Sequence, residues 1–283
     1  MSSGRDQARA TFWLLDAPDS LVAQSHREPD GTGIGWFDGT EPQISKQPIA
    51  AFGDTTFARE AKDISSRTFL AHIRFASTGS LLLRNTHPFE QRGRLFAHNG
   101  VIEDLPALEA ELGQDMALVH GDTDSERFFA LITREIDARG GDVGEGMAAA
   151  CAWVAANLPL LAINCILAAP EGLWALRYPE THDLFVLEHE PGRRLEHSSS
   201  LGSRVRSEHG IGHPLVLLAS ERMDNEPAWQ MLPAGELLHV GPQLGMNRRR
   251  ILQGPPARQL TLADLSPRAA QSQARSAPAP GSP

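Results

Sequence analysis

The sequence is poor in cysteine and has no long apolar run. Cys151 and Cys165 are its only two cysteines, and each lies inside an apolar stretch. Two separated cysteines supply neither a disulfide framework nor a cysteine-based zinc site, so we expect a reducing compartment, the cytoplasm. The longest apolar stretch, residues 158–169, contains Pro159 and Asn164 and is shorter than the roughly 20 residues that span a membrane. The N-terminus has no apolar signal-peptide core, so we predict no targeting segment and no membrane partner.

Excess positive charge is also missing. The chain has 26 Lys+Arg against 35 Asp+Glu, a net charge of −9, and therefore no electrostatic reason to bind nucleic acid or an anionic membrane. It contains no Gly-x-Ser-x-Gly elbow, P-loop or His-Glu-x-x-His motif. The run Gly31–Gly35 lacks the spacing of a dinucleotide fingerprint and predicts a tight turn into a strand. Because His72, His87 and His98 have no acidic partner in metal-ligand register, we interpret them as satisfied strand histidines and expect no metal.

With 41% hydrophobic residues, a chain of 283 residues can bury a sizeable core. We predict one domain over residues 10–255, preceded by an irregular N-terminus at 1–9. The Ser- and Pro-rich segment 256–283 has little to bury and is expected to be a disordered tail. Residues 193–212, rich in Ser, Gly, Arg and His, predict a long surface loop.

Hydrophobic periodicity predicts a layered α/β domain. The alternation over 69–75 predicts a strand on which Arg74 projects from the face opposite Phe69 and Ile73. Another predicted strand, 95–98, runs into Asn99-Gly100. Helical spacing predicts helices near 105–112, 125–136 and 147–156, and further strands are expected at 161–168, 173–177, 184–187, 215–219 and 236–240. Short connections such as 169–172 favour antiparallel sheets.

Two of the polar segments suit particular chemistry. The guanidinium of Arg74 suits bidentate capture of a carboxylate, and the Asn99 amide beside the unhindered N–H of Gly100 suits an oxyanion. Each also has an ordinary explanation, a surface ion pair for the arginine and a hairpin turn for Asn-Gly. The segment 85–89 predicts a turn, and 121–126 predicts a helix start with the spacing of a capping box.

The order of these segments is more informative than any one of them. Arg74 is followed by Asn-Thr-His-Pro-Phe at 85–89, His-Asn-Gly at 98–100 and Thr-Asp-Ser-Glu at 123–126. This series resembles the glutaminase domain of the class II glutamine amidotransferases, which are N-terminal-nucleophile hydrolases. It is most similar to the free-standing branch that includes the amidohydrolases of ergothioneine biosynthesis. The resemblance covers most of residues 10–240 and implies an α+β fold, a four-layer αββα sandwich of two antiparallel sheets.

The resemblance also implies a site for glutamine or a γ-glutamyl amide, with no cofactor and no metal. Arg74 would hold the α-carboxylate of the substrate and Asp124 its α-ammonium group. The side chain of Asn99 and the backbone N–H of Gly100 would form the oxyanion hole. Two further residues would line the pocket, namely His87 and, more weakly, Ser77.

The nucleophile of the family is missing. In these enzymes a cysteine becomes the first residue when the initiator methionine is removed, and its own amine is the general base. Here position 2 is Ser2, and the polar residues after it are not expected to form a buried strand. Cys151 and Cys165 are expected to be inert buried thiols. Either the true start lies upstream, which the intact binding and oxyanion residues favour, or the chain is a non-catalytic relative that binds glutamine or a γ-glutamyl compound.

The expected activity is release of ammonia or an amine through a thioester, as an amidohydrolase or an amidotransferase. Transfer of the ammonia would require a separate synthase as partner, because no synthase domain follows residue 255. Simple hydrolysis would require no partner. We expect the chain as written to be inactive for want of the nucleophile.

Overall fold

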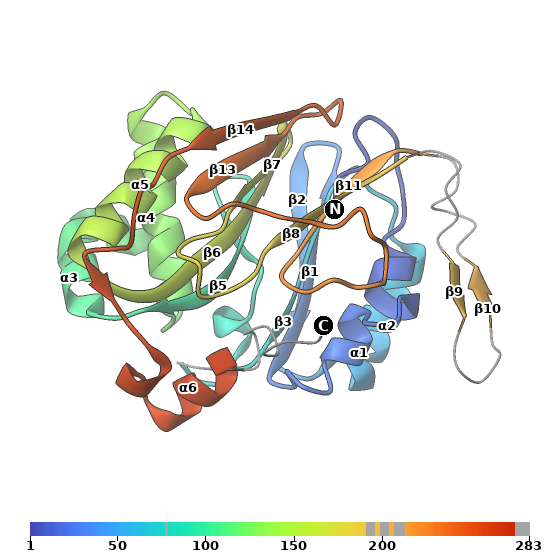
Figure 1. Cartoon of the computed structure of the whole chain (residues 1–283), viewed down its shortest axis with the longest axis horizontal. Coiled ribbons are helices and arrows are strands. Elements are labelled where there is room, and N and C mark those ends of the chain that lie inside the picture. The colour runs from blue at the N-terminus through green and yellow to red at the C-terminus, as the bar shows by residue number, and fades with distance from the viewer. Residues whose placement is uncertain (77–78, 191–195, 199–203, 207–212, 275–283) are drawn as a thin grey trace.

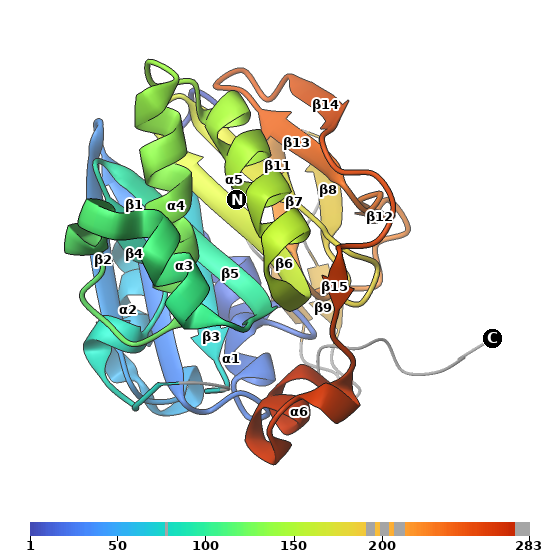
Figure 2. The ribbon, with the colours of Figure 1, turned by 90° about the vertical axis from the view of Figure 1, so that its left-hand side faces the viewer.

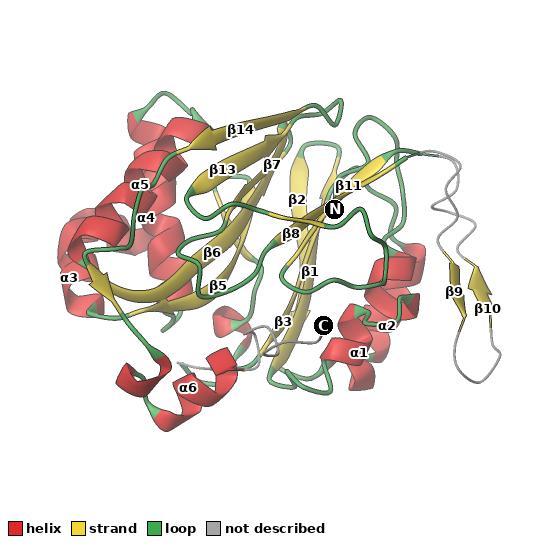
Figure 3. Cartoon of the chain, viewed as in Figure 1, coloured by secondary structure: helices red, strands yellow, loops and turns green. Residues whose placement is uncertain are grey.

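Two antiparallel sheets face each other between two layers of helices (Figures 1 and 3). The computed structural model describes residues 1–76, 79–190, 196–198, 204–206 and 213–274. The α+β class and the four-layer order predicted above are confirmed. No helix among these residues is long and apolar enough to cross a membrane.

The larger sheet carries most of the central strands. Its order is β14-β13-β7-β6-β5-β4, and β15 adds to β6 in parallel. The strands are β4 (Phe89–Gln91), β5 (Arg94–Ile102), β6 (Pro159–Ala169), β7 (Gly172–Leu176), β13 (Glu236–Val240), β14 (Met246–Arg250) and β15 (Arg258–Gln259). The first residues of β5 pair with β4, and the remainder of that edge is open toward the site described below.

The second sheet is assembled from two three-stranded pieces. One has the order β2-β1-β3 and the other β11-β8-β12. The strands are β1 (Gly31–Asp38), β2 (Glu41–Gln47), β3 (Phe69–Arg74), β8 (Phe185–His189), β11 (Leu215–Ala219) and β12 (Gln230–Met231). A separate pair, β9 (Glu196–Ser198) and β10 (Arg204–Arg206), occupies part of the predicted loop 193–212, whose other residues lie outside the described part of the chain.

The N-terminal residues join the two pieces of the second sheet. The N–H of Ser2 donates to the Val216 carbonyl at 2.8 Å, and the N–H of Val216 donates back to Ser2 at the same distance. On the other side, the Met1 amine donates to the Phe69 carbonyl at 2.8 Å. Ser2 and Ser3 are buried. The expectation that this polar segment does not enter a buried sheet is wrong, because backbone hydrogen bonds anchor it and Met1 and Ala8 pack into the core under α1 and α2.

Helices cover the outer face of each sheet (Figure 2). On the larger sheet these are α3 (Leu105–Leu112), α4 (Asp124–Ala138) and α5 (Val143–Asn157), and on the second sheet α1 (Leu21–Gln24), α2 (Thr55–Asp63) and the π-helical turn Phe12–Asp16. Short 3₁₀ turns lie at Ala51–Gly53, Leu83–Asn85, Gly113–Leu118 and Leu262–Asp264. One apolar core lies under α3–α5, another between the sheets, and a third under α1 and α2.

The prediction that residues 256–283 form a disordered tail is wrong for residues 256–274, which include a short strand and a helix. After β15 the chain forms helix α6 (Pro267–Ala274). Leu265 and Ala269 pack against Val101 of β5 and Leu161 of β6. These apolar contacts act together with hydrogen bonds of Arg268 and Gln273, which tie the helix to partners distant in the sequence. Residues 275–283 lie outside the described part.

The core under α4 gives a direct test of the packing. Phe96 of β5 is fully buried, and its ring stacks on Phe129 with centroids 4.8 Å apart. We expect Phe96→Ala to lower the free energy of unfolding by about 3–5 kcal/mol, since it leaves a cavity that the neighbours cannot fill. The matched control is Phe52→Ala, because that ring is 52% exposed, and there the loss should stay below about 1 kcal/mol. Urea titrations measure both, and equal losses would contradict this packing.

Candidate active site

A polar cavity of about 120 Å³ lies where β3, β5 and the start of α4 meet. The sequence predicted six site residues scattered over some fifty positions. Five of them line this cavity, namely Arg74, His87, Asn99, Gly100 and Asp124. The sixth, Ser77, lies outside the described residues.

Two buried side chains of opposite charge define the cavity. Arg74 ends β3 and is 5% exposed, and its Nη1 donates to the Ser80 carbonyl at 3.2 Å. Burial lowers the pKa of Arg74, while the carboxylates of Asp30 and Asp124 act against that shift, so the guanidinium keeps its charge. Asp124 opens α4, is 3% exposed, and accepts the Ile102 N–H at 2.9 Å through Oδ2. The N-terminus of the helix favours its negative charge.

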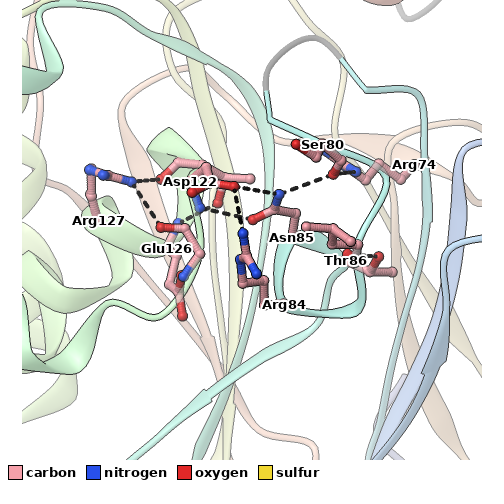
Figure 4. A network of polar contacts seen from close by, with 11 residues as sticks. Arg74, Ser80, Arg84, Asn85, Thr86, Asp122, Glu126 and Arg127 are labelled. Atoms are coloured by element: carbon pink, nitrogen blue, oxygen red, sulfur yellow. Dashed lines mark hydrogen bonds and ion pairs between the residues drawn. The ribbon is translucent and has the colours of Figure 1, made fainter.

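The buried amide of Asn85 connects the two segments that carry these charges (Figure 4). Its Nδ2 donates to the Ser80 carbonyl at 3.0 Å and to Asp122 Oδ2 at 3.1 Å, and its Oδ1 accepts the Asp122 N–H at 2.8 Å. Ser80 also accepts from Arg74. Asn85 is therefore the buried link between the loop after β3 and the loop before α4, and the exposed ion pair of Arg84 with Asp122 adds a second link.

The backbone of β5 presents an N–H to the cavity at Gly100. Gly100 pairs with Ile163 of β6, and the Ile163 N–H donates away from β5, to Tyr178, at 2.8 Å. The pair is consequently a non-hydrogen-bonded one, so the Gly100 N–H points away from β6 toward the open edge of β5. A Cβ on Gly100 would lie 1.9 Å from the Ala162 carbonyl oxygen, so no larger residue fits this position.

The chain is similar to known proteins in sequence and in fold. Residues 19–253 match the family model of the class II glutamine amidotransferases. The chain belongs to that family.

Similar proteins carry the same fold over most of the chain. The gamma-glutamyl-hercynylcysteine sulfoxide hydrolase of Mycobacterium tuberculosis is 27% identical over 247 residues, which are 83% of this chain and 88% of that protein. A glutamine aminotransferase class-II domain protein from Silicibacter pomeroyi superposes with a TM-score of 0.54 at 22% identity, covering 79% of this chain and 92% of the other. The glutamine phosphoribosylpyrophosphate amidotransferase of B. subtilis gives 0.56 at 16% identity, covering 83% of this chain and 46% of the other.

The N-terminus reaches the site from the second sheet. Met1 lines an apolar cavity that shares His98 and Asn99 with the polar one. Burial lowers the pKa of the Met1 amine to about 5, so the amine is neutral at pH 7. Ser2 lines neither cavity, and its Oγ accepts the Gly4 N–H at 3.3 Å. The geometry thus gives position 1, and not position 2, access to Asn99.

Neither cysteine has the surroundings of a reactive thiol. Cys151 and Cys165 are free and buried. The contact of Cys151 with Cys165, together with burial, raises the pKa of the Cys151 thiol well above its ordinary value, which disfavours a thiolate. Both cysteines belong to the apolar core under α4 and α5, and Cys165 also lines the apolar cavity that Met1 and Asn99 line.

Three histidines line the polar cavity, of which His87 and His98 are buried and His72 is half-buried. His98 is satisfied as predicted, with Nδ1 3.0 Å from Ser125 Oγ and Nε2 3.2 Å from the Ala162 carbonyl. The prediction was wrong for His87, because within the described residues neither of its ring nitrogens has a hydrogen-bond partner. His72 is satisfied in part: its Nδ1 has no partner there, but the ring has a backbone hydrogen bond with His98. Burial lowers the pKa of all three rings, that of His72 to about 3. Within the described residues no group of His, Cys, Asp and Glu could hold a metal ion.

The glycine run at 31–35 has a different role from the predicted turn. All five residues lie inside β1. A Cβ on Gly33 would lie 2.1 Å from the His87 carbonyl oxygen. Because glycine has no side chain, the turn at 85–89 can pack directly against the backbone of β1. Sequence reasoning missed this packing because the partner is more than fifty residues away. The glycine content of the run is the only feature of the sequence that indicates this close packing.

The histidines make stability depend on pH. Because the folded pKa of His72 is about 3 and that of an unfolded histidine is about 6.5, only the unfolded chain binds this proton between those values. His72 therefore costs no stability above pH 6.5 and about 1.4 kcal/mol per pH unit below it. We expect the free energy of unfolding, measured by urea titration, to fall between pH 6.5 and pH 5 by about 1–2 kcal/mol less in His72→Leu than in the native chain. Parallel losses in the two chains would refute the shift.

Proposed function

We propose that this domain binds the amino-acid end of glutamine or of a γ-glutamyl amide in the polar cavity, in the manner of an amidohydrolase. Arg74 holds the α-carboxylate and Asp124 the α-ammonium group. A zwitterion needs one fixed cation and one fixed anion, and these two side chains supply them. His87 lines the same pocket. Ser77, which follows Arg74 by three residues, stays in the proposal as a weaker candidate.

The observation that carries the proposal is the position of Asn99 and Gly100 between those charges and the N-terminus. A donor pair at this place would hold the oxyanion formed when the γ-amide is attacked. Beyond Asn99 the cavity becomes apolar, with Met1, Trp13 and Leu14 among its lining residues. That room supports an amine leaving group larger than ammonia. If ammonia is the product and is transferred, a separate synthase would accept it.

The second candidate function is binding without catalysis. It is favoured by one observation: in the described residues no cysteine lines the polar cavity that contains Asn99 and Gly100. Cys165 lines the neighbouring apolar cavity, but it is buried in contact with Cys151. For the 283 residues as they stand, we propose binding without turnover. Restoring a thiol distinguishes a domain that lacks only its nucleophile from one that has lost catalysis altogether.

The binding step predicts two essential side chains. Calorimetry with L-glutamine and with a γ-glutamyl amide should detect binding to the native chain, and Arg74→Ala and Asp124→Ala should each weaken it by at least about tenfold, since each removes a charge-assisted hydrogen bond. Arg92→Ala is the matched control, because Arg92 is exposed and pairs with Asp137. Unchanged affinity in either test variant removes that residue from the pocket.

The catalytic step predicts which position can carry the nucleophile. We expect Met1→Cys, expressed behind an added initiator methionine whose removal is verified by mass spectrometry, to release ammonia from glutamine. Ser2→Cys, exposed by loss of Met1, should not, because Ser2 lines neither cavity. In the active chain, Asn99→Ala should lower kcat by about 100-fold with little change in KM. Activity in the native chain or in Ser2→Cys would contradict the assignment, and an inactive Met1→Cys that still binds glutamine would favour the second candidate function.

A further inference from the structure

Helix α6 lies against the amino-acid end of the polar cavity. Ser272 and Gln273 line that cavity together with Arg74 and Asp124. The two α6 residues are 4% and 6% exposed. They therefore form part of the cavity wall and are not surface side chains that happen to lie nearby.

The first turn of α6 is tied to the backbone that follows Arg74. Arg268 Nε donates to the Ala76 carbonyl at 2.9 Å, and its Nη2 lies 3.2 Å from Asp30 Oδ2. The same carboxylate oxygen accepts the Ala76 N–H at 2.9 Å. Because Ala76 is two residues beyond Arg74, this contact fixes the helix relative to the proposed carboxylate-binding side.

The last turn of α6 has a second attachment, next to the strand pair β5–β6. The Gln273 amide oxygen lies 2.7 Å from His182 Nε2, and the His182 carbonyl accepts from Asn164 Nδ2 at 3.3 Å. Asn164 of β6 pairs directly with Asn99 of β5. The helix thus extends from the Arg74 loop to the strand pair that carries the proposed oxyanion donor.

The polar groups of this wall are already used by neighbours. Gln273 Nε2 donates to Ser272 Oγ at 3.2 Å, and that hydroxyl donates to the Ala269 carbonyl at 2.8 Å. A wall whose hydrogen bonds are internal acts on a ligand through its shape. Residues 267–274 also lie beyond residues 19–253, which match the family model.

We infer that α6 is a specificity element, which closes the amino-acid end of the cavity to substrates carrying a substituent on the α-amine. Free glutamine and γ-glutamyl compounds with an unsubstituted amine fit beside it, whereas an added group meets Ser272 and Gln273. This inference rests on the proposed function, because it takes Arg74 and Asp124 as the residues that bind the amino-acid end. In a close-fitting pocket one extra carbon costs about 10–200-fold in recognition.

The test compares L-glutamine with N-methyl-L-glutamine, which keeps a cationic amine and adds one methyl group. Calorimetry should give the native chain at least a tenfold higher Kd for the methylated compound. The double variant Arg268→Ala/Gln273→Ala removes both polar attachments of α6 and should reduce that ratio to about threefold or less. Gln271→Ala is the matched control on an exposed position of the same helix and should retain the native ratio.

The outcomes separate the two proposals. If the native chain does not bind L-glutamine, the proposed function fails and takes this inference with it. If glutamine binds but the ratio is the same in the native chain, the control and the double variant, α6 has no part in specificity and the proposed function stands. Gln273→Ala alone, with thermal unfolding of every variant, shows that a reduced ratio comes from an opened wall and not from a damaged fold.

Discussion

The geometry of the site depends on the hydrogen bonds of one buried amide. Asn85 binds the Ser80 carbonyl on one side and both the backbone and the side chain of Asp122 on the other. Ser80 holds Arg74, and Asp122 lies two residues before Asp124. Since a buried amide costs free energy unless its donors and acceptors are used, any movement of one loop away from the other would break several bonds at once. The distance between cation and anion is thereby fixed before any ligand binds.

Burial determines which groups in the cavity are charged. It holds the pKa of His72, His87 and His98 below the ordinary value of histidine, so three rings that line or adjoin the site are neutral near pH 7. Arg74 keeps its charge because its intrinsic pKa is so high, and Asp124 lies at a helix N-terminus that favours a carboxylate. The site therefore presents the buried cation Arg74 and the buried anion Asp124 among neutral rings, with the half-buried side chain of Glu28 also in the lining. A pair of opposite fixed charges suits a zwitterion better than a net anion.

The sequence predicted local elements well and long-range contacts poorly. The helix at 105–112 and the strands at 215–219 and 236–240 have the bounds expected from periodicity, because each buries one apolar face against a large core. The N-terminus and α6 were missed because they are anchored by backbone hydrogen bonds and by partners far away in the sequence. Five of the six predicted site residues line one cavity. They could be predicted from the sequence because the resemblance supplied their order, which no single motif could supply. Their roles stay predictions.

The same backbone pairing that seats the N-terminus gives its amine a chemical property. An edge strand would leave the Met1 amine in water with its usual positive charge, but between β3 and β11 it is buried and donates to the Phe69 carbonyl. Desolvation then favours the neutral form, which has a lone pair and can accept a proton. In a fold of this kind, a base for the reaction needs no additional side chain. Under the proposed function, a nucleophile at the first position would give its proton to this amine, in the cavity that Met1 and Asn99 both line.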